Sequence, residues 1–268
     1  MRRASKGLAF YPVMTIVVLI VLIYAYGQVD KLKSSYTGAL TKDIGSTQAE
    51  LFKTYQSGEE VLFYIDTAAK SSVQQAAVEF AQSGAVLAAT CGTVLIDDMA
   101  YTQWNAPAQE CFPLNPYPEF EQAFTKSMNV YIEQYTHPII SLPKDNYALT
   151  LTKKEIIGNA IEDIQIDVKG PNEAWLGRYY ANPSFTVNNP LDLQKIKDTA
   201  SLAKEIYLLC IDAACAKQEI TDRTLGWQLQ EQGTSLLIDV PLGTSVWATV
   251  DETYAYQPIT LKFALDFS

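Results

Sequence analysis

Histidine is nearly absent from this chain of 268 residues, which contains only His137. A hydrolase with a serine or cysteine nucleophile needs a base beside that nucleophile, so any such site would have to use this one side chain. His137 stands just before Pro138, at the expected end of a helix, where the helix dipole favours a histidine for structural reasons alone. The sequence therefore does not indicate histidine-based nucleophilic catalysis.

Motifs that bind phosphate or activate serine are also missing. The chain has neither a Walker loop nor a Gly-x-Gly-x-x-Gly segment, so we expect no nucleotide cofactor. Two Ser-x-x-Lys matches, Ser141 with Lys144 and Ser201 with Lys204, have the spacing of penicillin-binding proteins. Their Lys-Thr-Gly and Ser-Asp-Asn companions are absent. We expect neither catalytic residues of this class nor any cofactor.

Positive charge is scarce beyond the first seven residues. Arg2, Arg3 and Lys6 precede the first acid, and the remainder carries 17 lysines and arginines against 30 acids, a formal net charge of −13. Arg178 and Arg223 are its only arginines. Because nucleic-acid binding needs clustered cations, we expect no nucleic-acid partner. An acidic exterior is instead typical of a well-solvated domain.

Charge of either sign is missing between Lys6 and Asp30. The run Leu8–Gly27 reads LAFYPVMTIVVLIVLIYAYG, close to the roughly 20 apolar residues that a helix needs to cross a bilayer. It predicts an N-terminal transmembrane helix with the lipid bilayer as a partner. The basic residues before the run favour a cytoplasmic N-terminus and a C-terminal domain outside the cell membrane.

The same run has two further interpretations, both involving cleavage. Ala25-Tyr26-Gly27 is a small-x-small pattern that a signal peptidase could cut, which would release a secreted protein starting at Gln28. The other interpretation rests on Lys6-Gly7 followed directly by the apolar run.

Lys6-Gly7 before Leu8-Ala9-Phe10-Tyr11-Pro12-Val13-Met14 resembles the processing region of archaeal type IV pilin-like proteins, which carry a class III signal. The resemblance covers about the first 27 residues. It implies cleavage after Gly7 and a mature N-terminal helix that packs into a filament core. Pro12 stands where bacterial pilins have a glutamate, and a proline in the first helical turn costs no internal hydrogen bond.

All four cysteines follow the apolar run. An even count in an exported domain suggests disulfides, and proximity in the sequence favours Cys91 with Cys111 and Cys210 with Cys215. Four cysteines allow three connectivities. Zinc is the alternative, but neither pair has the two-residue spacing of zinc knuckles and His137 lies far from both. We expect disulfides and no metal site.

Apolar residues recur at helical spacing from about residue 47 to Gly84, after a Thr47…Glu50 capping pattern. Gly38 and Gly45 are expected to break the chain between this helix and the apolar run. The helix packs on its own domain or forms a stalk. The predicted domains are a membrane anchor (1–27), a helical stalk or first helix (28–84) and a disulfide-stapled α+β extracytoplasmic domain (85–268).

The remainder alternates helical and strand periodicity, so the fold class is α+β, with an antiparallel sheet and packed helices. A Gly158-Asn159 turn is expected between two strands. The expected helices are 119–135 and 191–209, and the expected strands are 147–151, 164–168, 178–187, 233–240, 243–250 and 259–267.

A contact surface is predicted in the loop between Cys91 and Cys111 and in the residues that follow it. Asp97 and Asp98 could contact a cation or a sugar, and Trp104, Tyr117 and Trp175 are the candidates for an exposed aromatic patch. Together these features favour a membrane-anchored extracytoplasmic surface protein with a binding or scaffolding role and no catalysis. Its expected partner is a protein or an envelope polymer, and self-association is compatible with the sequence.

Two alternatives use the same residues differently. One is a type IV pilin-like filament subunit, which requires an unbroken helix from the apolar run into the domain. The other is a cell-envelope hydrolase that uses two carboxylates across a groove. Its adjacent acids would come from Glu59-Glu60, Asp97-Asp98 or Glu162-Asp163.

Overall fold

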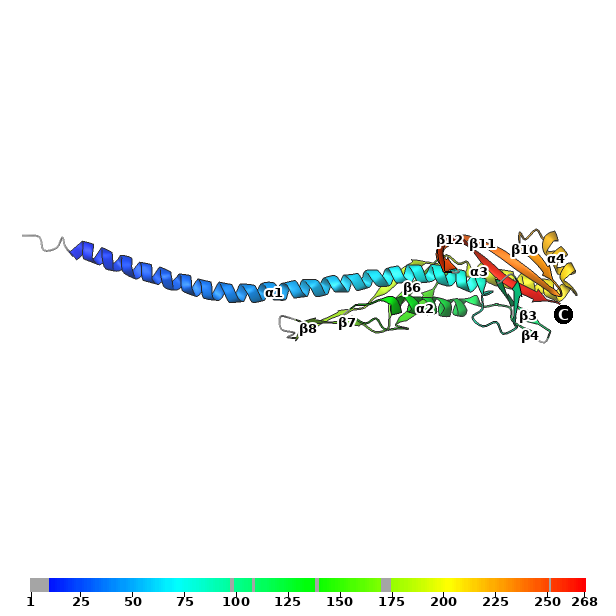
Figure 1. Ribbon diagram of the computed structural model, residues 1–268, viewed down its shortest axis with the longest axis horizontal. Coiled ribbons are helices and arrows are strands. Elements are labelled where there is room, and N and C mark those ends of the chain that lie inside the picture. The colour runs from blue at the N-terminus through cyan, green and yellow to red at the C-terminus, as the bar shows by residue number, and fades with distance from the viewer. Residues whose placement is uncertain (1–9, 97–98, 108, 138–139, 170–174, 251) are drawn as a thin grey trace, which may run out of the picture. The chain divides into compact units, whose positions relative to one another are not determined.

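The computed structural model describes residues 10–96, 99–107, 109–137, 140–169, 175–250 and 252–268. The chain forms two compact units. One contains Met1–Ser57 with Asp167–Tyr179, and the other contains Gly58–Ile166 with Tyr180–Ser268. The larger unit holds the main sheet, the shorter helices and both disulfides. Figure 1 shows the helices and strands along the chain.

Helices and strands are mixed along the chain, as the periodicity predicts. The helices are α1 (Phe10–Gln82), α2 (Pro116–Gln134), α3 (Leu193–Leu209) and α4 (Ala213–Asp222). The strands are β1 (Thr93–Ile96), β2 (Met99–Gln103), β3 (Asn105–Ala106), β4 (Gln109–Glu110), β5 (Tyr147–Leu151), β6 (Glu155–Ala160), β7 (Ile164–Lys169), β8 (Trp175–Ala181), β9 (Ser184–Asn188), β10 (Gln228–Gln232), β11 (Ser235–Val250) and β12 (Thr253–Asp266).

Helix α1 differs from the sequence-based prediction in two ways. It runs without interruption through Gly38 and Gly45, so the predicted breaks are wrong (Figure 1). Each glycine costs a helix only about 1 kcal/mol relative to alanine, which a 73-residue helix tolerates. The predicted transmembrane helix over Leu8–Gly27 is also wrong, because no helix in the described ranges is both long and apolar enough to cross a bilayer. The apolar residues are instead the first turns of a helix that continues through polar sequence.

The second half of α1 supplies one wall of the core in the larger unit. Its buried residues recur at spacings of three and four, which places them on one face of the helix. They include Val61, Ile65, Ala69, Val73, Ala76 and Phe80. This face meets α2, where the Phe80 and Phe120 ring centroids are 5.5 Å apart and the Ser72 hydroxyl donates to Met128 Sδ at 3.6 Å.

The main sheet has five strands in the order β1-β2-β12-β11-β10. Strand β12, predicted from the alternation of residues 259–267, pairs antiparallel with β11 and parallel with β2, where Phe263 lies opposite Thr102. Residues 233–240 and 243–250 are not two adjacent strands as predicted. They form the single strand β11, and both halves pair with β12 across a register shift between Pro241 and Ser245. Proline lacks the N–H that a regular ladder uses, which favours such an irregularity.

A second sheet joins β5, β6 and β9 in that order. The predicted Gly158-Asn159 turn is wrong, since both residues lie within β6. The glycine is required there by close packing, because a Cβ at Gly158 would lie 2.2 Å from the Phe185 ring of β9. The strand expected over 178–187 is divided at Asn182-Pro183, which separates β8 from β9.

The two predicted helices after residue 115 are confirmed with shifted bounds. Helix α2 begins with a proline in its first turn, where the missing N–H is harmless. Helix α3 is capped by Asp192, whose side chain accepts from the Lys195 amide at 3.1 Å. Helix α4, which the sequence pattern did not predict, is capped in the same way by Asp212, and α4 packs on β10 and β11.

Candidate functional site

Both disulfides suggested by proximity in the sequence are present. Cys91 is bonded to Cys111, and Cys210, the C-cap of α3, is bonded to Cys215 in the first turn of α4. All four cysteines are therefore paired. In the described part of the chain, no group of three histidine, cysteine or acidic side chains is placed to hold a metal ion.

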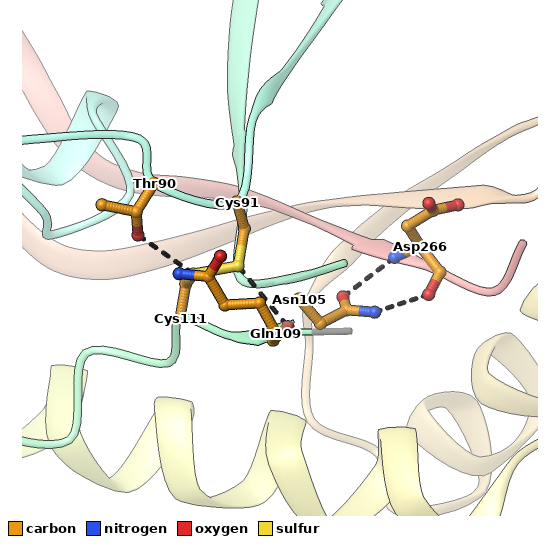
Figure 2. The surroundings of a disulfide bond; sticks show 6 residues. All are labelled: Thr90, Cys91, Asn105, Gln109, Cys111 and Asp266. Atoms are coloured by element: carbon orange, nitrogen blue, oxygen red, sulfur yellow. Dashed lines mark hydrogen bonds between the residues drawn. A yellow bond between two sulfur atoms is a disulfide. The ribbon is translucent and has the colours of Figure 1, made fainter. Parts of the chain in front are cut away.

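The first disulfide fastens a loop beside the end of β12 (Figure 2). The Thr90 hydroxyl donates to Cys111 Sγ at 3.0 Å. Nearby, the fully buried Asn105 makes two hydrogen bonds to the backbone of Asp266, donating to its carbonyl and accepting from its amide at 2.9 Å. This side-chain amide continues the hydrogen-bonding pattern of β12, so the loop and the sheet are held as one body.

The predicted contact residues are not gathered into one exposed patch. Trp104 is 0% exposed: its indole stacks on Phe263 with ring centroids 3.6 Å apart, and its Nε1 donates to the Gly84 carbonyl at 2.8 Å. Its ring belongs to the core and is not available to a partner. Tyr117 is half-buried in the first turn of α2.

The side chains of the other three predicted contact residues lie outside the described part of the structure. Asp97 and Asp98 lie outside the described residues. Trp175 begins β8, but its side chain also lies outside the described part of the structure.

The residues considered for catalysis have structural contacts. The lysines of the two Ser-x-x-Lys matches form ion pairs, Lys144 with Glu133 and Lys204 with Glu110. The Ser201 hydroxyl donates to the Lys197 carbonyl of its own helix at 3.0 Å. The His137 ring lies parallel to that of Tyr135, just after the end of α2. Each of these side chains therefore has a structural contact in the fold.

The described side chains of α1 between Val18 and Tyr26 are apolar and exposed on all sides of the helix. With 100° between successive residues, the exposed positions leave no face of this stretch polar. They are Val18, Leu19, Val21, Leu22, Ile23, Tyr24 and Tyr26, each between 54% and 76% exposed. Leu51, Phe52 and Phe63 are exposed farther along the same helix. Large exposed apolar surfaces mark sites that contact another protein, a membrane or a ligand.

A second exposed apolar cluster was not predicted from the sequence. Trp247 of β11 and Tyr254 and Tyr256 of β12 stand on one face of the hairpin, and we call these three residues the aromatic ladder. They are 50%, 64% and 62% exposed. The Trp247 ring lies 5.5 Å from that of Tyr254, at 21° between planes, and 5.6 Å from that of Tyr256, at 52°.

A sequence signal for this ladder existed but is weak. Trp247 alternates with the buried Val246 and Ala248, and Tyr254 and Tyr256 are two positions apart. Both segments therefore have the period of two that is typical of a strand with one exposed face. Only the β11–β12 register, which places Trp247 opposite Tyr256, brings the three rings together.

A pocket of about 490 Å³ lies beside the hairpin in the larger unit. Its walls come from the second half of α1, from α2 and from the edge of β11. The lining residues are Gln75, Glu79, Lys126, Ser127, Val130, Tyr131, Gln134 and Thr249. The pKa of Tyr131 is raised by burial and then by the nearby Tyr254 and Glu79, so an aromatic-ladder tyrosine and a pocket acid both lie close to this phenol.

No known protein family, curated protein or solved structure matches this chain.

Proposed function

We propose that this protein is a type IV pilin-like filament subunit, in which the first turns of α1 pack against the same turns of neighbouring copies. The observation that carries the proposal is the all-round exposure of apolar side chains from Val18 to Tyr26. A helix that is apolar on every face has to be buried on every face. Several identical helices packed in parallel provide that environment, whereas a single partner groove covers only one side.

The unbroken course of α1 supports the same proposal. A filament subunit needs a helix that continues from its apolar start into the folded domain, and α1 extends from Phe10 to Gln82 through Gly38 and Gly45. An anchored scaffold does not require this continuity. The Lys6-Gly7 junction before Leu8 supplies the processing site that the resemblance implies.

The proposal places the larger unit outside the cytoplasm. Its two disulfides support this location, since structural disulfides persist in oxidising compartments. The carboxylate hydrolase is less well supported. Of its three candidate pairs, Asp97-Asp98 lies outside the described residues, and in Glu162-Asp163 the Asp163 side chain accepts a hydrogen bond from Asn182 at 2.8 Å.

The test combines the mature N-terminus with assembly. The protein is expressed in cells that process class III signals, the fraction sheared from the cell surface is collected, and its intact mass and electron micrographs are recorded. We expect a chain that starts at Leu8 and filaments in the sheared fraction. An uncut chain, or a processed chain that stays monomeric, would contradict the proposal.

A matched pair of variants tests the packing surface. Leu22→Asp places a charge in the apolar turns of α1, and Leu208→Asp makes the same change on α3 at a similar exposure, 61% against 65%. We expect Leu22→Asp to lose filaments at unchanged thermal stability and Leu208→Asp to assemble normally. Equal assembly of the two variants would contradict packing through these turns of α1.

A further inference from the structure

The aromatic ladder is an unusual surface for a folded domain. Trp and Tyr side chains are large and apolar, and most domains cover such rings unless they are used in binding. Here three rings project from neighbouring positions of two paired strands, with Trp247 between Tyr254 and Tyr256. The three rings therefore form one contiguous exposed cluster on this face of the hairpin.

The part of the hairpin that carries the aromatic ladder is fixed by packing and by hydrogen bonds. Val246 and Ala248, which alternate with Trp247 along β11, are buried. The edge of the strand is tied to α1, because the Gln75 side chain donates to the Thr249 carbonyl at 2.9 Å and accepts from its amide at 2.8 Å. A ligand that stacks on the aromatic ladder does not have to order the hairpin first, which lowers the cost of binding.

The neighbouring pocket supplies polar groups next to the aromatic ladder. Thr249 lies on the same strand face as Trp247, opposite Tyr254, and also lines the pocket. The walls carry one acid, Glu79, and one base, Lys126, together with amide and hydroxyl groups. The two charges balance, so the pocket favours a neutral ligand rich in hydrogen-bonding groups over a strongly charged one.

A sugar chain has the chemistry that both parts require. The C–H face of a pyranose ring stacks on an aromatic face, while its hydroxyl groups donate and accept at its rim. A purely apolar partner would leave the pocket's polar groups desolvated and unpaired, which is costly. A nucleic acid would meet a chain with a net charge of −10.

We propose that the aromatic ladder and the adjacent pocket form a binding site for a neutral polysaccharide. Successive sugar rings stack on Tyr256, Trp247 and Tyr254, and the next sugar enters the pocket toward Glu79 and Lys126. This site goes beyond the proposed assembly through α1 and does not depend on it, since all of its residues lie in the larger unit.

The test uses the full chain and a panel of neutral hexasaccharides built from glucose, mannose, galactose or N-acetylglucosamine. Binding is measured by isothermal titration calorimetry. We expect at least one member to bind with a millimolar or lower Kd. Trp247→Ala should weaken that binding at least tenfold, and Trp247→Phe, which keeps a stacking face, should retain most of it.

Tyr180→Ala is the matched control, because Tyr180 is 54% exposed on β8 and is not part of the aromatic ladder. Its binding should equal that of the parent chain, and thermal unfolding should show that the Trp247 variants remain folded. The proposal is overturned if no neutral sugar binds, if only anionic sugars bind, or if Trp247→Ala binds as well as the parent. It is also overturned if Trp247→Ala changes only the self-association of the chain, since the aromatic ladder would then contact a second copy.

Discussion

The two ends of α1 place similar side chains in opposite environments. Between Val61 and Phe80 most apolar residues lie on one face and are buried within the larger unit, with Phe63 as an exposed exception. Between Val18 and Tyr26 they occupy every face and remain exposed. The first stretch therefore packs against the same polypeptide, whereas the described side chains of the second are left exposed. One helix thus contributes to the folding of the domain and, in the filament that we propose, to the assembly of copies.

Aspartate substitutions at the two ends should separate these roles most strongly. Ala76→Asp buries an unpaired charge at a fully buried site of α1, and we expect a loss of about 3 to 5 kcal/mol in the free energy of unfolding. Leu22→Asp should change that free energy by less than about 0.5 kcal/mol, as for exposed substitutions generally. Urea unfolding followed by tryptophan fluorescence measures both. Similar losses in the two variants would contradict the division of roles.

The disulfides should contribute to the free energy of unfolding of the larger unit and not to the structure of the first turns of α1. Replacing Cys91 and Cys111 by serine opens a bridge that spans 20 residues, and loop-closure entropy predicts a loss of about 3 kcal/mol. Replacing Cys210 and Cys215, 5 residues apart, should cost about 2 kcal/mol by the same relation.

Hydrogen exchange provides the matching control. Neither double variant should change the exchange of amides 18–28, because the described side chains of that stretch are exposed. Altered exchange there would mean that the first turns of α1 depend on the domain after all.

Alkaline pH should weaken the domain through Tyr101. Its pKa is raised to about 12 by burial, then by the Asp239 charge and by a hydrogen bond to Asp239, above the value near 10 of an unfolded chain. Because the folded state holds the proton more tightly, this contribution is complete below pH 10 and is lost as the pH rises toward 12.

We expect Tyr101→Phe to reduce the loss of stability between pH 9 and pH 11.5 by about 2 kcal/mol. Denaturant midpoints at the two pH values measure this, with Tyr180→Phe as an exposed control. An unchanged pH dependence in Tyr101→Phe would show that the phenol does not carry the effect.

The smallest expected effect concerns the continuity of α1. A Cβ at Gly45 meets no atom within 4 Å, so Gly45→Ala should stabilise the helix locally by about 1 kcal/mol. Hydrogen exchange of amides near residue 45 should slow accordingly, with the global midpoint unchanged. Faster exchange would mean that the chain is not helical there.

The sequence predicts the elements better than their partners. The stripe from Val61 to Phe80 and the alternation in β12 were readable because burial on one side imposes a period. The continuity of α1 through Gly38 and Gly45 was not readable, because the helical residues on either side outweigh the low helix propensity of a single glycine. The division of residues 233–250 into two strands failed for a similar reason: only the pairing with β12 shows that one strand passes the irregularity at Pro241.

The candidate surfaces show the same limit. Trp104 was expected at the surface, but its indole N–H finds the Gly84 carbonyl and its ring finds Phe263, contacts between distant segments that no local pattern encodes. The aromatic ladder was missed because it exists only in the β11–β12 register. By contrast, the apolar start of α1 was evident from composition, although its predicted role as a transmembrane helix was wrong.

The parallel pairing of β2 with β12 also constrains the speed of folding. The side chain of Asn105 and the backbone of Asp266 meet across 161 positions of sequence, so the central strand can be fixed only after a very long loop has closed. Such non-local contacts make folding slow, and strand edges stay exposed in the meantime. We therefore expect refolding of this domain to take far longer than the microseconds in which an isolated helix such as the start of α1 forms.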